Sequence, residues 1–191
     1  MTAKLSDHEF EEILTSYRTI EIKVSRMMHV FCAPHCSVCT TRCCRPDICR
    51  EAAKSPFLLA VHQTTRTFTK ATGYLGCTGC TLATGRPPIC HAFLCGAILK
   101  ALPDDLTRYA LECLADLVDH LGKSLCRNRH LVEALTEAAL RTVDIHEFLS
   151  RLQDTESAMF ILERFFTDKI DFEPAEIKSL AKIRRPPPQL V

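Results

Sequence analysis

Apolar residues recur every three or four positions near the start of the chain, which is typical of one face of an α-helix. This apolar stripe consists of Phe10, Ile13, Leu14, Tyr17, Ile20, Val24, Met27 and Phe31. Ser6 and Glu9 precede most of it at the spacing of a capping box, in which each side chain bonds the backbone of the other residue. The pattern predicts a long first helix over residues 7–30.

The same periodicity predicts further helices along the chain. Asp104 or Asp105 is suited to cap a helix that runs to about residue 121, where Gly122 ends it. Other helices are expected at about residues 55–69, 89–101, 128–141, 144–153 and 155–168. No run of residues reads as a convincing strand. We therefore expect an all-α, bundle-like domain.

Two segments interrupt the helical pattern. Residues 32–49 lose the period and contain Pro34 and Pro46, and residues 72–88 are rich in glycine. Glycine permits tight turns that bring the backbone close to a bound ion. Both segments are expected to be loops, and together to form an irregular centre within the helical fold.

These boundaries predict four parts in the chain. They are an N-terminal helix (1–31), a cysteine-cluster region (32–100), a C-terminal helical region packed on it (101–170) and a tail (171–191). The tail ends in a proline-rich sequence, which predicts partial disorder.

Cysteine is the anomaly in the composition, with twelve residues and no tryptophan in 191 positions. Ten of them fall into two groups, Cys32, Cys36, Cys39, Cys43, Cys44 and Cys49, then Cys77, Cys80, Cys90 and Cys95. A C-x2-C step lets two sulfurs converge on one ion, and four sulfurs satisfy tetrahedral zinc or the corners of an iron–sulfur cluster. The pattern therefore predicts a metal centre.

Charge and hydropathy narrow the class of protein. The formal net charge is +1, so no overall field attracts nucleic acid or an acidic membrane surface. The N-terminus is acidic where a signal peptide needs an apolar core, and no apolar run is long enough to span a bilayer. We expect a cytoplasmic protein, where clustered cysteines are more often metal ligands or redox groups than disulfides.

The predicted metal ligands are eight thiolates, Cys36, Cys39, Cys43, Cys44, Cys77, Cys80, Cys90 and Cys95. Adjacent side chains diverge, so either Cys43 or Cys44 serves a second centre or one of them is a spectator. Four residues stay open as ligands, Cys32, Cys49, His35 and His91. Outside the two groups, Cys113 and Cys126 lie on predicted helices and are interpreted as ordinary buried cysteines.

Three pieces of sequence resemble the YkgJ-type cysteine-cluster family, a zinc- or iron-chelating domain. They are CSVCTTRCC at 36–44, GCTL at 79–82 and RPPICHAFLC at 86–95. The resemblance implies chelation of zinc or of an iron–sulfur cluster, with no general reaction assigned. Members usually carry a further cysteine just before the Arg-Pro pair, and here Cys77 or Cys95 would take its place.

The leading hypothesis is a metal-binding cysteine-cluster protein that holds an iron–sulfur cluster or zinc in a structural, electron-transfer or sensing role. One alternative is a zinc-stapled module that binds a partner protein through its C-terminal helices, residues 104–168. A second alternative is an enzyme, either an iron–sulfur enzyme or a thiol oxidoreductase that uses Cys77 and Cys80.

Overall fold

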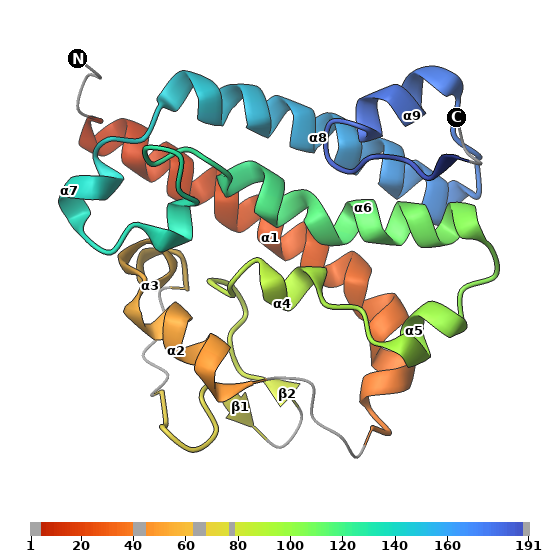
Figure 1. Ribbon diagram of the computed structural model, residues 1–191, viewed down its shortest axis with the longest axis horizontal. Helices are drawn as coiled ribbons and strands as arrows, with labels where there is room; N and C mark the ends of the chain where they lie inside the picture. Colours follow the sequence, from red (N-terminus) through yellow and green to blue (C-terminus); the bar gives the residue numbers. More distant parts are fainter. Residues whose placement is uncertain (1–4, 40–44, 63–67, 77–78, 189–191) are drawn as a thin grey trace.

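Helices make up most of the chain in the computed structural model, which describes residues 5–39, 45–62, 68–76 and 79–188 (Figure 1). The helices are α1 (Asp7–Cys36), α2 (Pro46–Lys54), α3 (Pro56–His62), α4 (Ile89–Ala92), α5 (Gly96–Lys100), α6 (Asp105–Gly122), α7 (Glu137–Leu140), α8 (Ile145–Asp168) and α9 (Pro174–Leu180). A two-residue antiparallel hairpin, β1 (Leu75–Gly76) with β2 (Gly79–Cys80), is the sheet structure of the described residues. The expected all-α class is confirmed.

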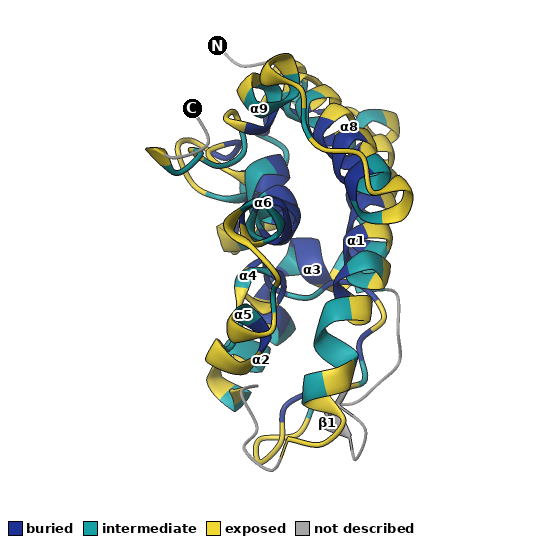
Figure 2. Cartoon of the chain, turned by 90° about the vertical axis from the view of Figure 1, so that its right-hand side faces the viewer, coloured by how far each residue is buried: buried dark blue, intermediate teal, exposed yellow. Residues whose placement is uncertain are grey.

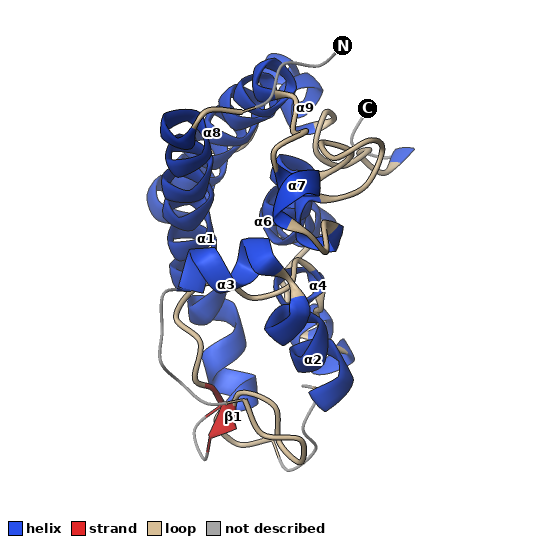
Figure 3. Ribbon diagram, turned by 90° about the vertical axis from the view of Figure 1, so that its left-hand side faces the viewer, coloured by secondary structure: helices blue, strands red, loops and turns tan. Residues whose placement is uncertain are grey.

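The long helices α1, α6 and α8 contact one another and enclose the core. Buried residues gather where these helices face each other, and among them Tyr17, Leu114 and Phe148 are each 0% exposed (Figure 2). The hairpin lies at the opposite end of the molecule from α8 and α9 (Figures 1 and 3). The hairpin and the loops around it therefore lie beside the core. The three long helices α1, α6 and α8 enclose this core, and we call them the helical frame.

Helix α1 begins as predicted but ends six residues later than predicted. The Glu9 N–H donates to the Ser6 hydroxyl and the Ser6 N–H donates to the Glu9 carboxylate, which completes the capping box. Pro34 lies inside the helix, where its ring leaves the carbonyl of Val30 without a helical partner. Since Val30 is 69% exposed, water can reach this part of the helix. The prediction that the loop starts at Cys32 was therefore wrong, and Cys32 and Cys36 are helical.

Helix α6 matches its prediction closely. Asp104 is the N-cap, and its carboxylate accepts a 2.6 Å hydrogen bond from the Thr107 N–H. The two helices expected at 144–153 and 155–168 form one continuous helix, α8, which is capped by Asp144. None of the helices in the described part of the chain is long and apolar enough to cross a membrane.

The helix expected at 128–141 is mostly absent. A single 3-10 turn (Leu131–Glu133) and the short α7 replace it. The backbone has positive φ angles at Ser124 and Arg127, just before the expected helix, and at Asn128, its first residue, so the chain turns sharply where the helix should begin.

The segment 171–191, for which partial disorder was expected, contains α9. Leu180 of this helix is 0% exposed. Beyond it, the Tyr109 hydroxyl donates to the carbonyl of Arg184 at 3.0 Å, and the Arg184 guanidinium pairs with Asp116 at 2.6 Å. These contacts hold the described part of the segment against α6.

Replacing Tyr17 by phenylalanine is expected to stabilise the protein. The Tyr17 ring packs edge-on against Phe57 at 4.9 Å, but its hydroxyl is buried without a hydrogen-bond partner among the described residues. A buried hydroxyl without a partner costs about 1–3 kcal/mol, so its removal should raise the free energy of unfolding by about 1 kcal/mol. Urea unfolding of the wild type and the variant measures the change, and a less stable variant would show that the hydroxyl has a favourable contact.

Candidate metal centre

The first group of thiols starts on α1. Cys32 and Cys36 lie at i and i+4 and thus on the same side of the helix. The chain then turns, with the Cys39 N–H bonded to the Cys36 carbonyl at 3.4 Å. Cys36 and Cys39 are exposed, whereas Cys32 is half-buried. The end of α1 therefore brings three cysteines of the first segment to one place at the edge of the fold.

The second group of thiols is spread over the hairpin and two short helices. Cys80 ends β2, Cys90 lies in α4, and Cys95 is the N-cap residue of α5. The predicted single helix over 89–101 is broken because Phe93 has an extended backbone (φ −81°, ψ 109°). This break separates Cys95 from the helical turn that carries Cys90, so helical spacing does not relate the two thiols.

Cys32 and Cys95 connect the two segments. Burial, followed by the neighbouring thiols of Cys36 and Cys95, raises the pKa of Cys32 to about 11. Helices α1 and α5 are in contact, which agrees with this proximity. A thiol with so high a pKa stays protonated at neutral pH unless a cation stabilises its thiolate.

Cys49 makes a second connection between the segments. It lies on α2, and its Sγ is so close to Gly73 that a Cβ on this glycine would be 2.7 Å from the sulfur. Gly73 also has a φ of +62°, a conformation that favours glycine. Beyond it, burial and then the thiols of Cys49 and Cys80 raise the pKa of Tyr74. Cys49, which the sequence left open, therefore lies beside the hairpin that carries Cys80.

Three of the eight predicted ligands, Cys43, Cys44 and Cys77, lie outside the described residues. Within the described ranges, no group of three or more His, Cys, Asp or Glu side chains is close enough together to hold a metal ion. The structure thus brings the two cysteine segments into contact at two places, but it does not show a completed ligand set.

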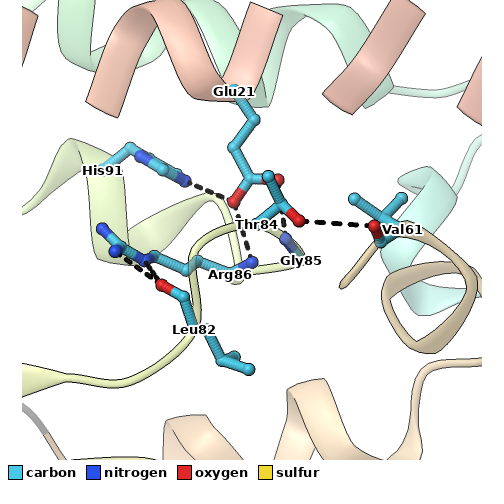
Figure 4. Close-up of polar contacts among 7 residues, drawn as sticks. All are labelled: Glu21, Val61, Leu82, Thr84, Gly85, Arg86 and His91. Carbon is cyan, nitrogen blue, oxygen red and sulfur yellow. Dashed lines mark hydrogen bonds and ion pairs between the residues drawn. The ribbon is translucent and has the colours of Figure 1, made fainter. Parts of the chain in front are cut away.

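A buried carboxylate that the sequence analysis missed fixes the second segment on α1. Glu21 is 0% exposed and accepts hydrogen bonds from the Gly85 N–H at 2.7 Å and from the Arg86 N–H at 2.9 Å (Figure 4). The third contact joins Glu21 Oε1 to His91 Nε2 at 3.2 Å, and this pair is buried on both sides. Since an ionised carboxylate only accepts, we assign the proton of this bond to Nε2.

Other polar contacts hold the same segment in shape. The Arg86 guanidinium donates through Nε and Nη2 to the carbonyl of Leu82, at 2.9 and 2.6 Å. The Thr84 hydroxyl donates to the carbonyl of Val61 at 3.3 Å, which attaches the segment to the end of α3 (Figure 4). The Arg-Pro motif therefore has a structural use, because its arginine closes the turn that precedes Cys90.

The histidines that were open as ligands have different surroundings. His91 is buried on Glu21, so its Nε2 atom is engaged in this pair. His35 is half-buried in the last turn of α1, between Cys32 and Cys36. The expected burial of the two cysteines outside the groups is confirmed, since Cys113 is 0% and Cys126 is 4% exposed. Cys113 lies on α6 as expected, but the expected helical position of Cys126 was wrong, because this residue lies in the turn after α6.

One feature of the sequence could have identified Glu21, namely its position within the apolar stripe of the first helix. It lies between Ile20 and Val24 on the side that faces the core, and both neighbours are buried. A charged residue at such a position requires a partner inside the protein. The sequence does not say that the partners lie more than sixty residues further along the chain.

Comparisons with known proteins found no match to this chain. No protein-family model matches the chain, and neither the curated proteins nor the solved structures contain a match.

Proposed function

We propose that this chain is a metal-binding protein in which thiolates from both cysteine segments hold an iron–sulfur cluster or zinc. The observation that carries the proposal is the packing of Cys49, from the first segment, against Gly73 of the second. The contact of α1, which carries Cys32, with α5, which has Cys95 as its N-cap, supports it independently. The two segments are far apart in the sequence, and they come together both where Cys49 packs on Gly73 and where α1 contacts α5.

The chemistry of the donors fits this class of metal. Thiolates are soft ligands that select zinc and iron–sulfur clusters over magnesium or calcium. Clustered thiolates also repel one another, and a bound cation compensates that repulsion. The ligands proposed within the described residues are Cys36, Cys39, Cys80, Cys90 and Cys95. The likeness to the YkgJ-type family favours the same chemistry.

The structural setting favours a role in structure, electron transfer or sensing. Four of the five proposed ligands are exposed at the edge of the helical frame, and the fifth, Cys95, packs against the core. An iron–sulfur cluster at such an edge is accessible to a redox partner, whereas zinc in a closed four-thiolate shell serves structure.

Metal analysis of protein purified anaerobically, with a reductant and without chelators, tests the proposal. We expect either iron with acid-labile sulfide and a brown visible spectrum, or a colourless protein with stoichiometric zinc. Zinc without iron or sulfide would decide against the cluster. Protein that contains no metal and takes up neither zinc nor iron with sulfide would refute the proposed function.

A further inference from the structure

Glu21 is a carboxylic side chain buried on α1 among apolar neighbours. Its carboxylate is 0% exposed, and burial of such a group is unfavourable unless hydrogen bonds and a counter-charge compensate it. Replacing buried ionic groups by apolar residues of similar volume is often neutral or stabilising. The network of Glu21 with Gly85, Arg86 and His91 therefore points to a role beyond holding the core together.

Glu21 and the first group of thiols share one rigid element. Cys32 and Cys36 follow Glu21 on α1 by about three and four helical turns, or roughly 16 and 22 Å along the axis. A carboxylate fixed on this helix thus has a set position relative to both thiols. A segment that is hydrogen-bonded to this carboxylate therefore also has a set position relative to the thiols of Cys32 and Cys36.

The groups attached to Glu21 belong to the segment that leads into the second group of thiols. Gly85 and Arg86 precede Cys90, and His91 follows it directly in α4. Cys95 comes one residue before α5 begins. Three hydrogen bonds from two different turns of this segment prevent it from rotating or sliding on α1, which a single bond would allow.

We propose that Glu21 is a positioning residue of the metal centre. It locks residues 85–91 onto α1 and thereby fixes the position of Cys90 and Cys95 relative to Cys32 and Cys36, which lie on the same helix as Glu21. This inference rests on the proposed function and adds to it a residue that holds no metal itself. Metal–sulfur distances tolerate changes of about 0.2 Å, so a small shift of the segment is enough to weaken binding.

The Glu21→Gln variant tests the proposal with Co²⁺ as the probe. Glutamine keeps the size of the side chain, but one of its two ends is an amide NH2 that would face a backbone N–H donor. We expect the affinity for Co²⁺, measured under anaerobic reducing conditions by competition with a coloured chelator, to fall on the order of tenfold or more. The thiolate-to-cobalt absorption at saturation should also weaken, because fewer sulfurs reach the ion.

Thr155→Val is the matched control for a loss of stability alone. Thr155 is also 0% exposed, and its hydroxyl donates to the Arg151 carbonyl at 2.7 Å within α8. This variant should lower the melting temperature of the metal-free protein and leave the Co²⁺ affinity unchanged. Unchanged affinity in Glu21→Gln would overturn the positioning role, as would an equal loss of affinity in Thr155→Val at the same loss of stability.

His91→Leu keeps the test open if Glu21→Gln does not fold. It removes one of the three bonds to Glu21 and leaves both backbone bonds, so the expected loss of Co²⁺ affinity is smaller but measurable. Wild-type affinity in His91→Leu would count against the proposal in that case. A wild-type protein that binds no Co²⁺, zinc or iron would instead remove the proposed function itself, together with this inference.

Discussion

Serine in place of Cys90 or Cys39 is expected to remove most of the bound metal from the protein. A serine hydroxyl is neither soft nor ionised at neutral pH, so each variant loses one thiolate from the ligand set. Both cysteines are exposed, and their replacement should not disturb the core. We expect the metal content of each purified variant to fall below about half that of the wild type, because removal of one ligand opens the coordination shell.

The same variants should lose thermal stability, because metal binding adds to the free energy of folding. In a chain of this size, each kcal/mol that is lost lowers the melting temperature by about 2–4 °C. Removing the metal from the wild type by chelation should lower its melting temperature to that of the variants. A Cys90→Ser protein that melts like the metal-loaded wild type would show that Cys90 is not a ligand.

Cys126→Ser is the control for the substitution itself. Cys126 is 4% exposed, and burial raises the pKa of its thiol to about 11. The neutral thiol therefore packs in the interior like a small hydrophobic side chain. This variant should keep the metal content of the wild type per folded molecule. Equal metal content in Cys39→Ser, Cys90→Ser and Cys126→Ser would contradict the ligand assignment.

The parts of the fold that could be predicted from the sequence are those determined by neighbouring residues. The capping box of Ser6 and Glu9 and the N-cap at Asp104 depend on contacts three residues apart, and both are present. The apolar period that predicts the buried face of α6 is likewise a local pattern. It selects Leu106, Tyr109, Ala110, Cys113, Leu114, Leu117 and Val118, and all of these are buried apart from Leu106, which lies at the edge of the core. Such features require no knowledge of the rest of the chain.

The end of α1 shows where local patterns mislead. Proline usually ends or kinks a helix, and this rule led us to expect a loop from Cys32 onward. The helix continues to Cys36 because it loses only one hydrogen bond at Pro34, on a side that water reaches. The consequence for the site is direct, since two thiols acquire the fixed spacing of a helix.

The arrangement of the candidate site could be predicted only in part. The sequence identified two groups of thiols, but the contact of Cys49 with Gly73 depends on how α2 and the hairpin pack. Likewise, Glu21 binds groups that lie more than sixty residues away. Contacts between distant segments are set by the whole fold, and no local period encodes them.

Helix α6 ties the frame and the site together, because it contacts both α1 and α4. Helix α1 carries the first thiols, and α4 carries Cys90 and the histidine that binds Glu21. The positions of the thiols therefore depend on the packing of a helix that has no predicted ligand of its own. A substitution of a buried residue of α6 should therefore reduce metal binding only to the extent that it unfolds the protein.

Leu114→Ala is accordingly expected to destabilise the protein by about 2–5 kcal/mol, because it leaves a cavity in a core that is closely packed. Leu114 is 0% exposed in the middle of α6. Urea unfolding measures the loss, and Leu135→Ala is the matched control, since Leu135 is 68% exposed and its truncation should change stability by less than about 0.5 kcal/mol. At low urea the folded Leu114→Ala protein should still bind metal with the wild-type stoichiometry. A similar, small change in both variants would show that α6 does not form the centre of the core.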